Sequence, residues 1–137
     1  MFRDRIIAAL RDPLRPAVSV EFFPPKDAGT AETLLRTARA LQPLGIDFAS
    51  ITYGAGGTSR DTTLSYGGEL VGMGFPLVGH LTCVGHSRDE LRALIRQYDE
   101  AGFSGILALR GDPPKGQAVF TPHPDGFSHA EELVELI

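Results

Sequence analysis

Four short apolar runs, separated by stretches with helical periodicity, are the feature of this sequence that most limits its possible folds. The runs cover Ala17–Phe23, Ile46–Thr52, Leu77–Thr82 and Gly105–Leu109, and all are rich in Val, Ile, Leu or Phe. They lack the regular apolar–polar alternation of strands with one wet face, which is typical of strands buried on both faces of a parallel sheet. The pattern therefore predicts an α/β fold with a parallel sheet, either a doubly wound open sheet or a (β/α)8 barrel.

The segments between these runs carry signals for helix ends. Ser87 with Glu90 predicts a capping box, and Ser128 with Glu131 predicts a second one further along the chain. Thr30 is expected to cap an earlier helix. An amphipathic helix is expected in front of the first strand, while the glycines within Asp61–Val71 weaken the helix predicted there. The result is a βα order repeated four times, with the chain ending inside its fourth crossover helix.

Polar residues follow each predicted strand at its carboxyl end. One from each strand, in the order Glu21, Thr52, His80 and Arg110, recurs at intervals of about 30 residues, as expected for repeated βα units. Such a period predicts that the four side chains lie at one level of the sheet. In barrels and open α/β sheets alike, ligands bind at this edge. The residues next to them, Tyr53, Gly111 and Asp112, belong to the same predicted edge.

Each of these residues also has a structural explanation. A glutamate inside an apolar strand requires a partner or a function, so Glu21 is either functional or ion-paired to an arginine. His80 could be a histidine satisfied within the core. Arg110 and Asp112 could mark a turn before the two prolines that follow, and the glycines of Gly54–Gly57 could form a flexible loop rather than a ligand-binding backbone.

Composition and motifs exclude several other classes of protein. With 42% hydrophobic and 22% charged residues, the chain is typical of globular domains, and no apolar run is long enough to span a membrane. A net charge of −4 without a basic cluster gives no indication of nucleic-acid binding. No GxGxxG turn, P-loop or metal-ligand spacing occurs. The single cysteine, Cys83, excludes an internal disulfide and favours a reducing, cytoplasmic setting.

Five ordered blocks carry a resemblance to a known family. The blocks VSVEFFPPK, ITYGAGGTSRD, GHLTC, LALRGDPP and FSHAEELV closely resemble the methylenetetrahydrofolate reductases from about Val18 onward. The resemblance implies a (β/α)8 barrel that holds FAD at its carboxyl strand ends. It also implies reduction of 5,10-methylenetetrahydrofolate to 5-methyltetrahydrofolate, with NADH or NADPH as the hydride donor. On this reading, residues 1–137 are the N-terminal half of one catalytic barrel, holding its first four βα units without an internal domain boundary.

The resemblance also assigns roles to individual residues. Glu21 matches the general acid, whose neutral, protonated form burial would favour, and Asp112 matches a carboxylate that stabilises the cationic folate. The positions matching contacts to FAD are Thr52, Tyr53, Ala55, His80, Leu109, Arg110, Gly111, Asp112, His129 and Ala130. His129 stands where family members often carry tyrosine.

The protein is expected to form a homo-oligomer. Two other hypotheses about its function remain open. One is a pterin- or phosphate-binding barrel without flavin. The other is a non-catalytic half-barrel that assembles with another chain, because a four-stranded sheet leaves two open edges and one bare face.

Overall fold

A computed structural model describes residues 2–53, 59–113 and 116–137. The four strands are β1 (Ser19–Phe22), β2 (Phe48–Ile51), β3 (Leu77–Thr82) and β4 (Gly105–Leu109). The helices are α1 (Phe2–Arg11), α2 (Ala28–Leu41), α3 (Ser59–Gly72), α4 (Arg88–Glu100) and α5 (Ala130–Leu136), with a 3-10 turn, η1 (Gln42–Leu44), after α2. The strands form one parallel sheet in the order β1-β2-β3-β4. The predicted α/β class and parallel pairing are confirmed, and the arrangement is consistent with part of a (β/α)8 barrel.

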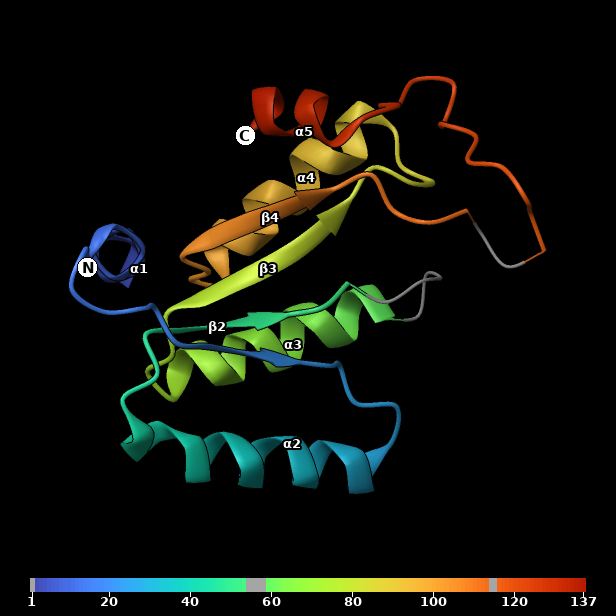
Figure 1. The fold of residues 1–137 in the computed structure, drawn as a ribbon. Helices are drawn as coiled ribbons and strands as arrows, with labels where there is room; N and C mark the ends of the chain where they lie inside the picture. Colours follow the sequence, from blue (N-terminus) through green and yellow to red (C-terminus); the bar gives the residue numbers. More distant parts are fainter. Residues whose placement is uncertain (1, 54–58, 114–115) are drawn as a thin grey trace.

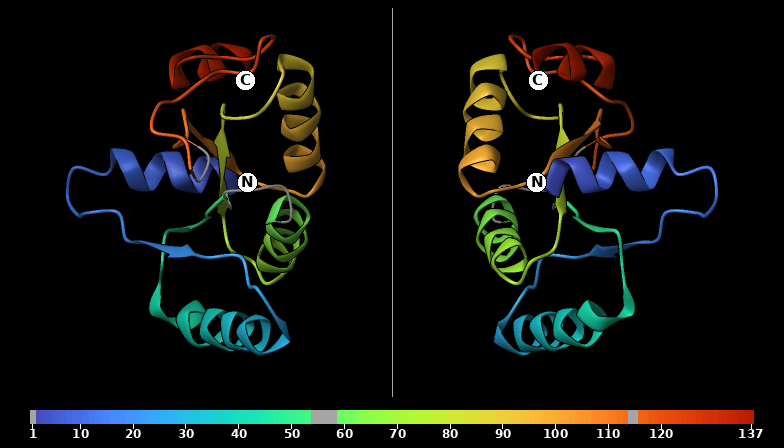
Figure 2. Two further views of the ribbon diagram at one scale, coloured as in Figure 1. Left: turned by 90° about the vertical axis from the view of Figure 1, so that its right-hand side faces the viewer. Right: turned by 90° about the vertical axis from the view of Figure 1, so that its left-hand side faces the viewer.

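The sheet is curved, and its crossover helices lie on its outer side. Seen along the strands, α2, α3, α4 and α5 form an arc outside the sheet, while α1 lies across the open, concave side (Figure 2). Figure 1 shows α1 near the amino ends of the strands, so the carboxyl ends lie at the opposite end of the molecule. Among the described residues, no helix has the length and apolar character needed to cross a membrane.

The predicted strands β3 and β4 match the structure in both bounds, whereas β1 and β2 are shorter than expected. At the start of β1, the Val18 amide donates a hydrogen bond to the Asp47 side chain (2.9 Å) instead of joining the sheet. The Asp47 amide in turn donates to the Val18 carbonyl (2.9 Å). These two hydrogen bonds between Val18 and Asp47 thus take the place of regular strand pairing at the start of β1. Beyond Phe23, Pro24 removes a main-chain donor, which helps to end β1.

Helix caps confirm one prediction and correct two. The Ser87–Glu90 capping box is present at α4. Helix α2 is capped by Asp27 rather than Thr30, because Thr30 occupies the third helical position and its amide donates to the Asp27 carboxylate (2.8 Å).

At α5 the expected cap at Ser128 is displaced by one residue. The amides of Ser128 and His129 both donate to Glu132, at 2.8 and 2.9 Å, so the carboxylate that closes the first turn is not Glu131. Helix α3 forms in spite of its glycines and extends beyond the predicted range.

Two clusters of buried side chains join the sheet to the helices. One contains residues of β1, β2, α2 and α3, and the other contains residues of β3, α4 and α5 together with Phe127. Both clusters draw on the outward side of the sheet. The concave side carries Glu21 and His80 together with the apolar side chain of Leu107, which pairs in register with His80.

Candidate functional site

The concave face of the sheet carries the candidate acid and histidine. Side chains alternate between the two faces of a strand, and paired residues of parallel neighbours point the same way. Phe22 and Leu81 are buried in the clusters beneath the helices, so their neighbours Glu21 and His80 face the concave side. Glu21 pairs in register with Ser50, which shares this face.

Glu21 and His80 come together across the sheet. The Glu21 Oε2 atom lies 3.3 Å from His80 Nε2, within ion-pair distance, and accepts a hydrogen bond from the Ser50 hydroxyl at 3.4 Å. His80 Nε2 is nevertheless buried without a hydrogen bond of good geometry to any described residue. Burial lowers the pKa of the His80 imidazole, and the nearby Glu21 carboxylate partly opposes this effect. A neutral imidazole with an unused nitrogen therefore lies beside a carboxylate.

The burial expected for Glu21 is not found in the described chain. Its side chain is 46% exposed, whereas that of His80 is only 10% exposed. The reason is that the apolar neighbours of Glu21 in sequence point to the other side of β1, as Phe22 does, and nothing among the described residues covers the concave face at this point. The alternative partner, an arginine, is also not found for Glu21 in the described part of the chain.

The expectation of one common level for the strand-end residues is only partly met. Glu21 is level with Ser50, two residues before Thr52. His80 is level with Leu107, three residues before Arg110. Equal spacing in the sequence counts residues through helices and loops, and it does not fix the hydrogen-bond register of the strands. The residues therefore share one edge but occupy successive steps along it.

Tyr53 points to the other side of the sheet from Glu21. Its ring packs against the cluster formed by β3, α4 and α5, and its hydroxyl lies 2.9 Å from His86 Nε2. The two rings meet edge to face, with centroids 5.8 Å apart. Thr52 lies at the end of β2, where its amide donates to the Phe22 carbonyl (3.0 Å). Through its side chain, Tyr53 is thus part of the packing around β3.

The residues after β4 form a second polar group at the carboxyl edge. Arg110 and Asp112 are exposed, and Leu109 pairs with Thr82. Between the two charged residues, Gly111 has a φ of +88°, and a Cβ there would come within 2.6 Å of the Val84 side chain. Glycine is therefore required at this turn, which sends the chain away from β4 and places the flanking side chains at the edge.

His129 and Ala130 lie at the start of α5. His129 is 71% exposed at its side chain, and its Nδ1 lies 3.7 Å from the Glu132 carboxylate, so this ring belongs to the helix cap. The main-chain amides of Ser128 and His129 hold the pKa of Glu132 below its usual value. The carbonyl of His129 accepts from the buried thiol of Cys83 at 3.6 Å. The predicted residue Ala55 lies outside the described residues, as do the glycines around it.

Three residues that matter to this edge were not predicted. Ser50 shares the Glu21 face, and strand alternation from Thr52 could have identified it. His86 bonds to Tyr53, and Phe120 stacks against Arg110 with 4.8 Å between the guanidinium carbon and the ring centroid. The first contact joins two loops distant in sequence, the second joins two residues of the connection between β4 and α5, and no local pattern indicates either.

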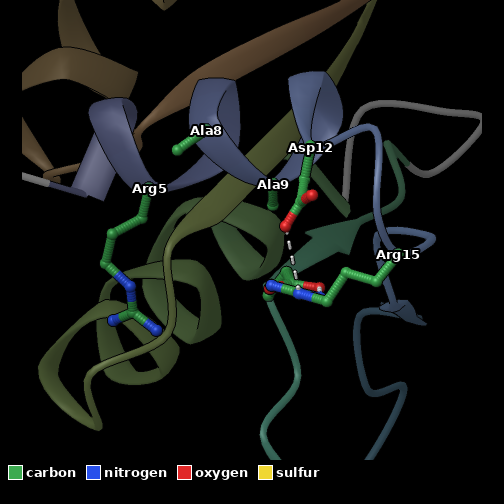
Figure 3. Close-up of a pocket in the computed structure, with 6 residues that line it drawn as sticks. Arg5, Ala8, Ala9, Asp12 and Arg15 are labelled. Atoms are coloured by element: carbon green, nitrogen blue, oxygen red, sulfur yellow. Dashed lines mark hydrogen bonds and ion pairs between the residues drawn. The ribbon is translucent and has the colours of Figure 1, made fainter.

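A shallow hollow of about 330 Å³ lies at the opposite, amino end of the strands. Its lining residues are Arg5, Ala8, Ala9, Asp12, Arg15 and Asp47 (Figure 3). The Arg15 guanidinium donates two hydrogen bonds to the Asp47 carboxylate, at 2.6 and 2.8 Å, and holds the pKa of that carboxyl well below its usual range. The hollow is therefore part of the junction between α1 and the sheet, remote from Glu21 and His80.

The fold and the polar edge together define a parallel β/α protein that presents ionisable side chains at the carboxyl ends of its strands. Comparison with known sequences identifies the family to which this β/α protein belongs. The sequence model for methylenetetrahydrofolate reductase matches residues 6–137, and this chain belongs to that family.

Individual relatives agree with the family match. "Methylenetetrahydrofolate reductase (NADH) 1" of Zea mays is 35% identical over 135 residues, covering 98% of this chain and 23% of the maize protein. The 5,10-methylenetetrahydrofolate reductase of Salmonella typhimurium is 43% identical over 100 residues, covering 72% and 34%. The Escherichia coli protein of the same name is 42% identical over 121 residues, covering 88% and 39%. The chain thus spans between about a fifth and two fifths of the length of the curated relatives it matches.

Proposed function

We propose that the full-length protein reduces 5,10-methylenetetrahydrofolate to 5-methyltetrahydrofolate, with FAD as cofactor and NADH or NADPH as hydride donor. The observation that carries the proposal is the pair formed by Glu21 and His80 on the concave face, at the edge where α/β proteins of this kind bind ligands. The names of the relatives support the substrate, and the maize name supports NADH for that protein. The proposal includes a cytoplasmic setting and a homo-oligomer.

The described residues fit a flavin at this edge. His80 offers a buried nitrogen without a hydrogen-bond partner among them, and the turn at Gly111, with its positive φ, places Arg110 and Asp112 at the same edge. The residues that would hold the cofactor are Thr52, Tyr53, Ala55, His80, Leu109, Arg110, Gly111, Asp112, His129 and Ala130. Of these, Tyr53 would contribute through its main chain, because its side chain is engaged with His86, whereas the His129 ring is largely exposed. When bound, the flavin supplies the hydride chemistry.

Glu21 has the task of general acid in this proposal. The one-carbon bridge of the substrate is unreactive as a closed ring, and protonation of a ring nitrogen allows it to open to an iminium cation. Glu21 donates that proton from its carboxyl group. Burial lowers the pKa of His80 and favours its neutral form. The cationic substrate therefore meets no second positive charge beside Glu21. The exposed carboxyl group of Asp112, three residues after β4, stabilises the cationic substrate.

Glu21 needs a drier environment than the described residues provide. A carboxyl group that is 46% exposed is solvated, whereas a general acid that works near neutral pH must keep its proton. We therefore place these 137 residues as the N-terminal half of one barrel, in which further strands and the bound ligands cover the concave face. The exposed side chain of Leu107 (45%), which shares that face with His80, supports such a cover.

A second candidate function is a half-barrel that assembles with another chain without catalysis. The specific observation in its favour is that, within residues 2–53, 59–113 and 116–137, β1 and β4 each have a neighbouring strand on one side only. Bound flavin in the purified full-length protein, seen as its visible absorbance, separates the two candidates, because only the reductase requires it.

The experiment compares Glu21→Gln with Glu32→Gln in the full-length protein. The first variant keeps size and polarity but removes the transferable proton, while Glu32 lies exposed on α2, away from the site. Stopped-flow absorbance reports flavin reduction by NAD(P)H separately from its reoxidation by methylenetetrahydrofolate. For Glu21→Gln we expect reduction to be nearly unchanged and reoxidation to fall by roughly 10²–10⁴-fold. Equal slowing of both halves would make Glu21 a structural residue, and no slowing would remove it from the mechanism.

A further inference from the structure

Arg110 and Phe120 form a contact at the carboxyl edge that the proposed mechanism does not use. Arg110 follows β4 directly, while Phe120 lies in the segment that returns from this edge to α5. The guanidinium carbon lies over the aromatic ring, 4.8 Å from its centroid. At this distance a guanidinium is attracted by the negative face of the ring.

The edge of the Arg110 guanidinium is free to bind an anion. Its Nε donates weakly to the Gly111 carbonyl at 3.4 Å, and within the described part of the chain no carboxylate forms an ion pair with it. Arg15 provides the contrast, since both of its terminal nitrogens donate to Asp47 at 2.6 and 2.8 Å. A guanidinium attracted by a ring keeps its forked set of N–H donors, which suits a phosphate or carboxylate.

The segment that carries Phe120 is fixed downstream against the start of α4. The Arg88 amide donates to the Asp125 carbonyl (2.9 Å), and the Arg88 guanidinium lies 5.1 Å from the centroid of the Phe127 ring. A Cβ at Gly126 would come within 2.4 Å of the His86 carbonyl oxygen, so the main chain passes very close to the loop after β3. The chain downstream of Phe120 is therefore held in place by contacts that do not involve Arg110.

We propose that Phe120 is a positioning residue that holds the Arg110 guanidinium in place for an anionic group of the cofactor. The inference rests on the proposed function, because it takes FAD as the ligand whose phosphate or flavin oxygens meet Arg110. Without the ring, the long Arg110 side chain samples more rotamers and must be ordered when the ligand binds. Phe120 thus acts on affinity through Arg110, and it does not touch the ligand itself.

The test measures FAD affinity of the full-length protein by the change in flavin fluorescence. Phe120→Leu keeps an apolar side chain but removes the aromatic face, and we expect the dissociation constant to rise about two- to fivefold, as for the loss of one exposed cation–π contact. Phe120→Tyr retains the face and should restore the affinity. Val119→Ala is the matched control, because the neighbouring Val119 is 73% exposed and should leave the affinity unchanged.

A double-mutant cycle separates positioning from a general structural role. In an Arg110→Gln background, Phe120→Leu should have no further effect on FAD affinity, because the group that it positions is gone. The same loss in both backgrounds, or no loss in either, would overturn the inference. Thermal unfolding without FAD of the unmodified protein, the two single variants and the double variant tests the contact independently of the ligand. Strictly additive effects of the two substitutions on stability would also count against the inference. Failure of the unmodified protein to bind FAD would overturn the proposed function, whereas the unfolding cycle would still decide whether the two residues are coupled.

Discussion

Two adjacent glycines of α3 should respond in opposite ways to the same substitution. A Cβ at Gly67 would lie 2.2 Å from Cζ and 2.8 Å from Cε2 of Phe103, while a Cβ at Gly68 would meet nothing within 4 Å. The Phe103 ring has little room to retreat. It is stacked on Tyr98 with centroids 4.6 Å apart, and an added Cβ at Gly79 would be only 2.8 Å from its other edge.

The expected magnitudes follow from these contacts. Replacing glycine by alanine inside a helix stabilises it by about 0.5–1 kcal/mol, and this gain applies to both positions. At Gly67 the extra methyl group also overpacks the interface between α3 and β3, at a cost of about 1–3 kcal/mol. Gly68→Ala should therefore be more stable than the unmodified protein, and Gly67→Ala should be up to about 2 kcal/mol less stable. The difference between the two variants isolates the packing cost, since helix propensity cancels.

Urea unfolding of the full-length protein, followed by far-UV circular dichroism, measures both variants. The double variant Gly67→Ala with Phe103→Leu provides the check on the cause. Removing the Cζ atom should relieve the clash, so the two changes together should cost less than the sum of their separate effects. Equal stabilities for Gly67→Ala and Gly68→Ala, or strictly additive effects with Phe103→Leu, would refute the packing argument.

Three further predictions concern pH and assembly. Because hydrogen bonds from Arg15 hold the pKa of Asp47 below its usual range, the stability it contributes should be present above about pH 4 and lost as the pH falls below that value. In acid titrations of unfolding followed by fluorescence, Asp47→Asn should reduce this loss of stability. An unchanged profile would contradict a stabilising role for the Arg15–Asp47 pair. Burial lowers the pKa of His80, so the unfolded chain binds that proton more readily, and stability should decline as the pH falls through about 6.5. His80→Gln should remove this decline, and its persistence would assign it to another group. The isolated 137-residue polypeptide should self-associate or precipitate and should not retain FAD, because its outer strands have unpaired edges. Size-exclusion chromatography that shows a monodisperse, flavin-loaded monomer would disprove this.

Much of the fold was accessible to sequence reasoning because it depends on local patterns. The apolar runs that become β3 and β4 were predicted with the correct bounds, and the Ser87–Glu90 box was recognised from its spacing. The cap of α2 was misplaced because Asp27 and Thr30 bond to one another reciprocally, so both residue types fit a cap and only the backbone decides between them. Boundaries were least accurate where a side chain replaces a main-chain partner, as Asp47 does before β1.

The candidate site was predictable in its membership but not in its geometry. That Glu21 and His80 belong to one edge follows from the order of the strands, and their separation of 3.3 Å follows from a register that the sequence does not reveal. The contact of Arg110 with Phe120 depends on how a long loop returns over the sheet. Such a contact leaves no periodic signal, because only one of the two residues lies next to a regular element.

The exposure of Glu21 illustrates why residue type alone misleads about environment. Its strand neighbours are apolar because they meet α2 and α3 on the outer side, and they say nothing about the concave side to which Glu21 points. His80 lies two strands away, on β3, which has a neighbour on each side, and its side chain is only 10% exposed, whereas that of Glu21 on the edge strand is 46% exposed. Burial therefore increases from the edge of this sheet toward its centre. A further strand beside β1 would place Glu21 where His80 is now, so the acidity that the proposed reaction requires is a property of the closed sheet and not of the strand that carries the residue.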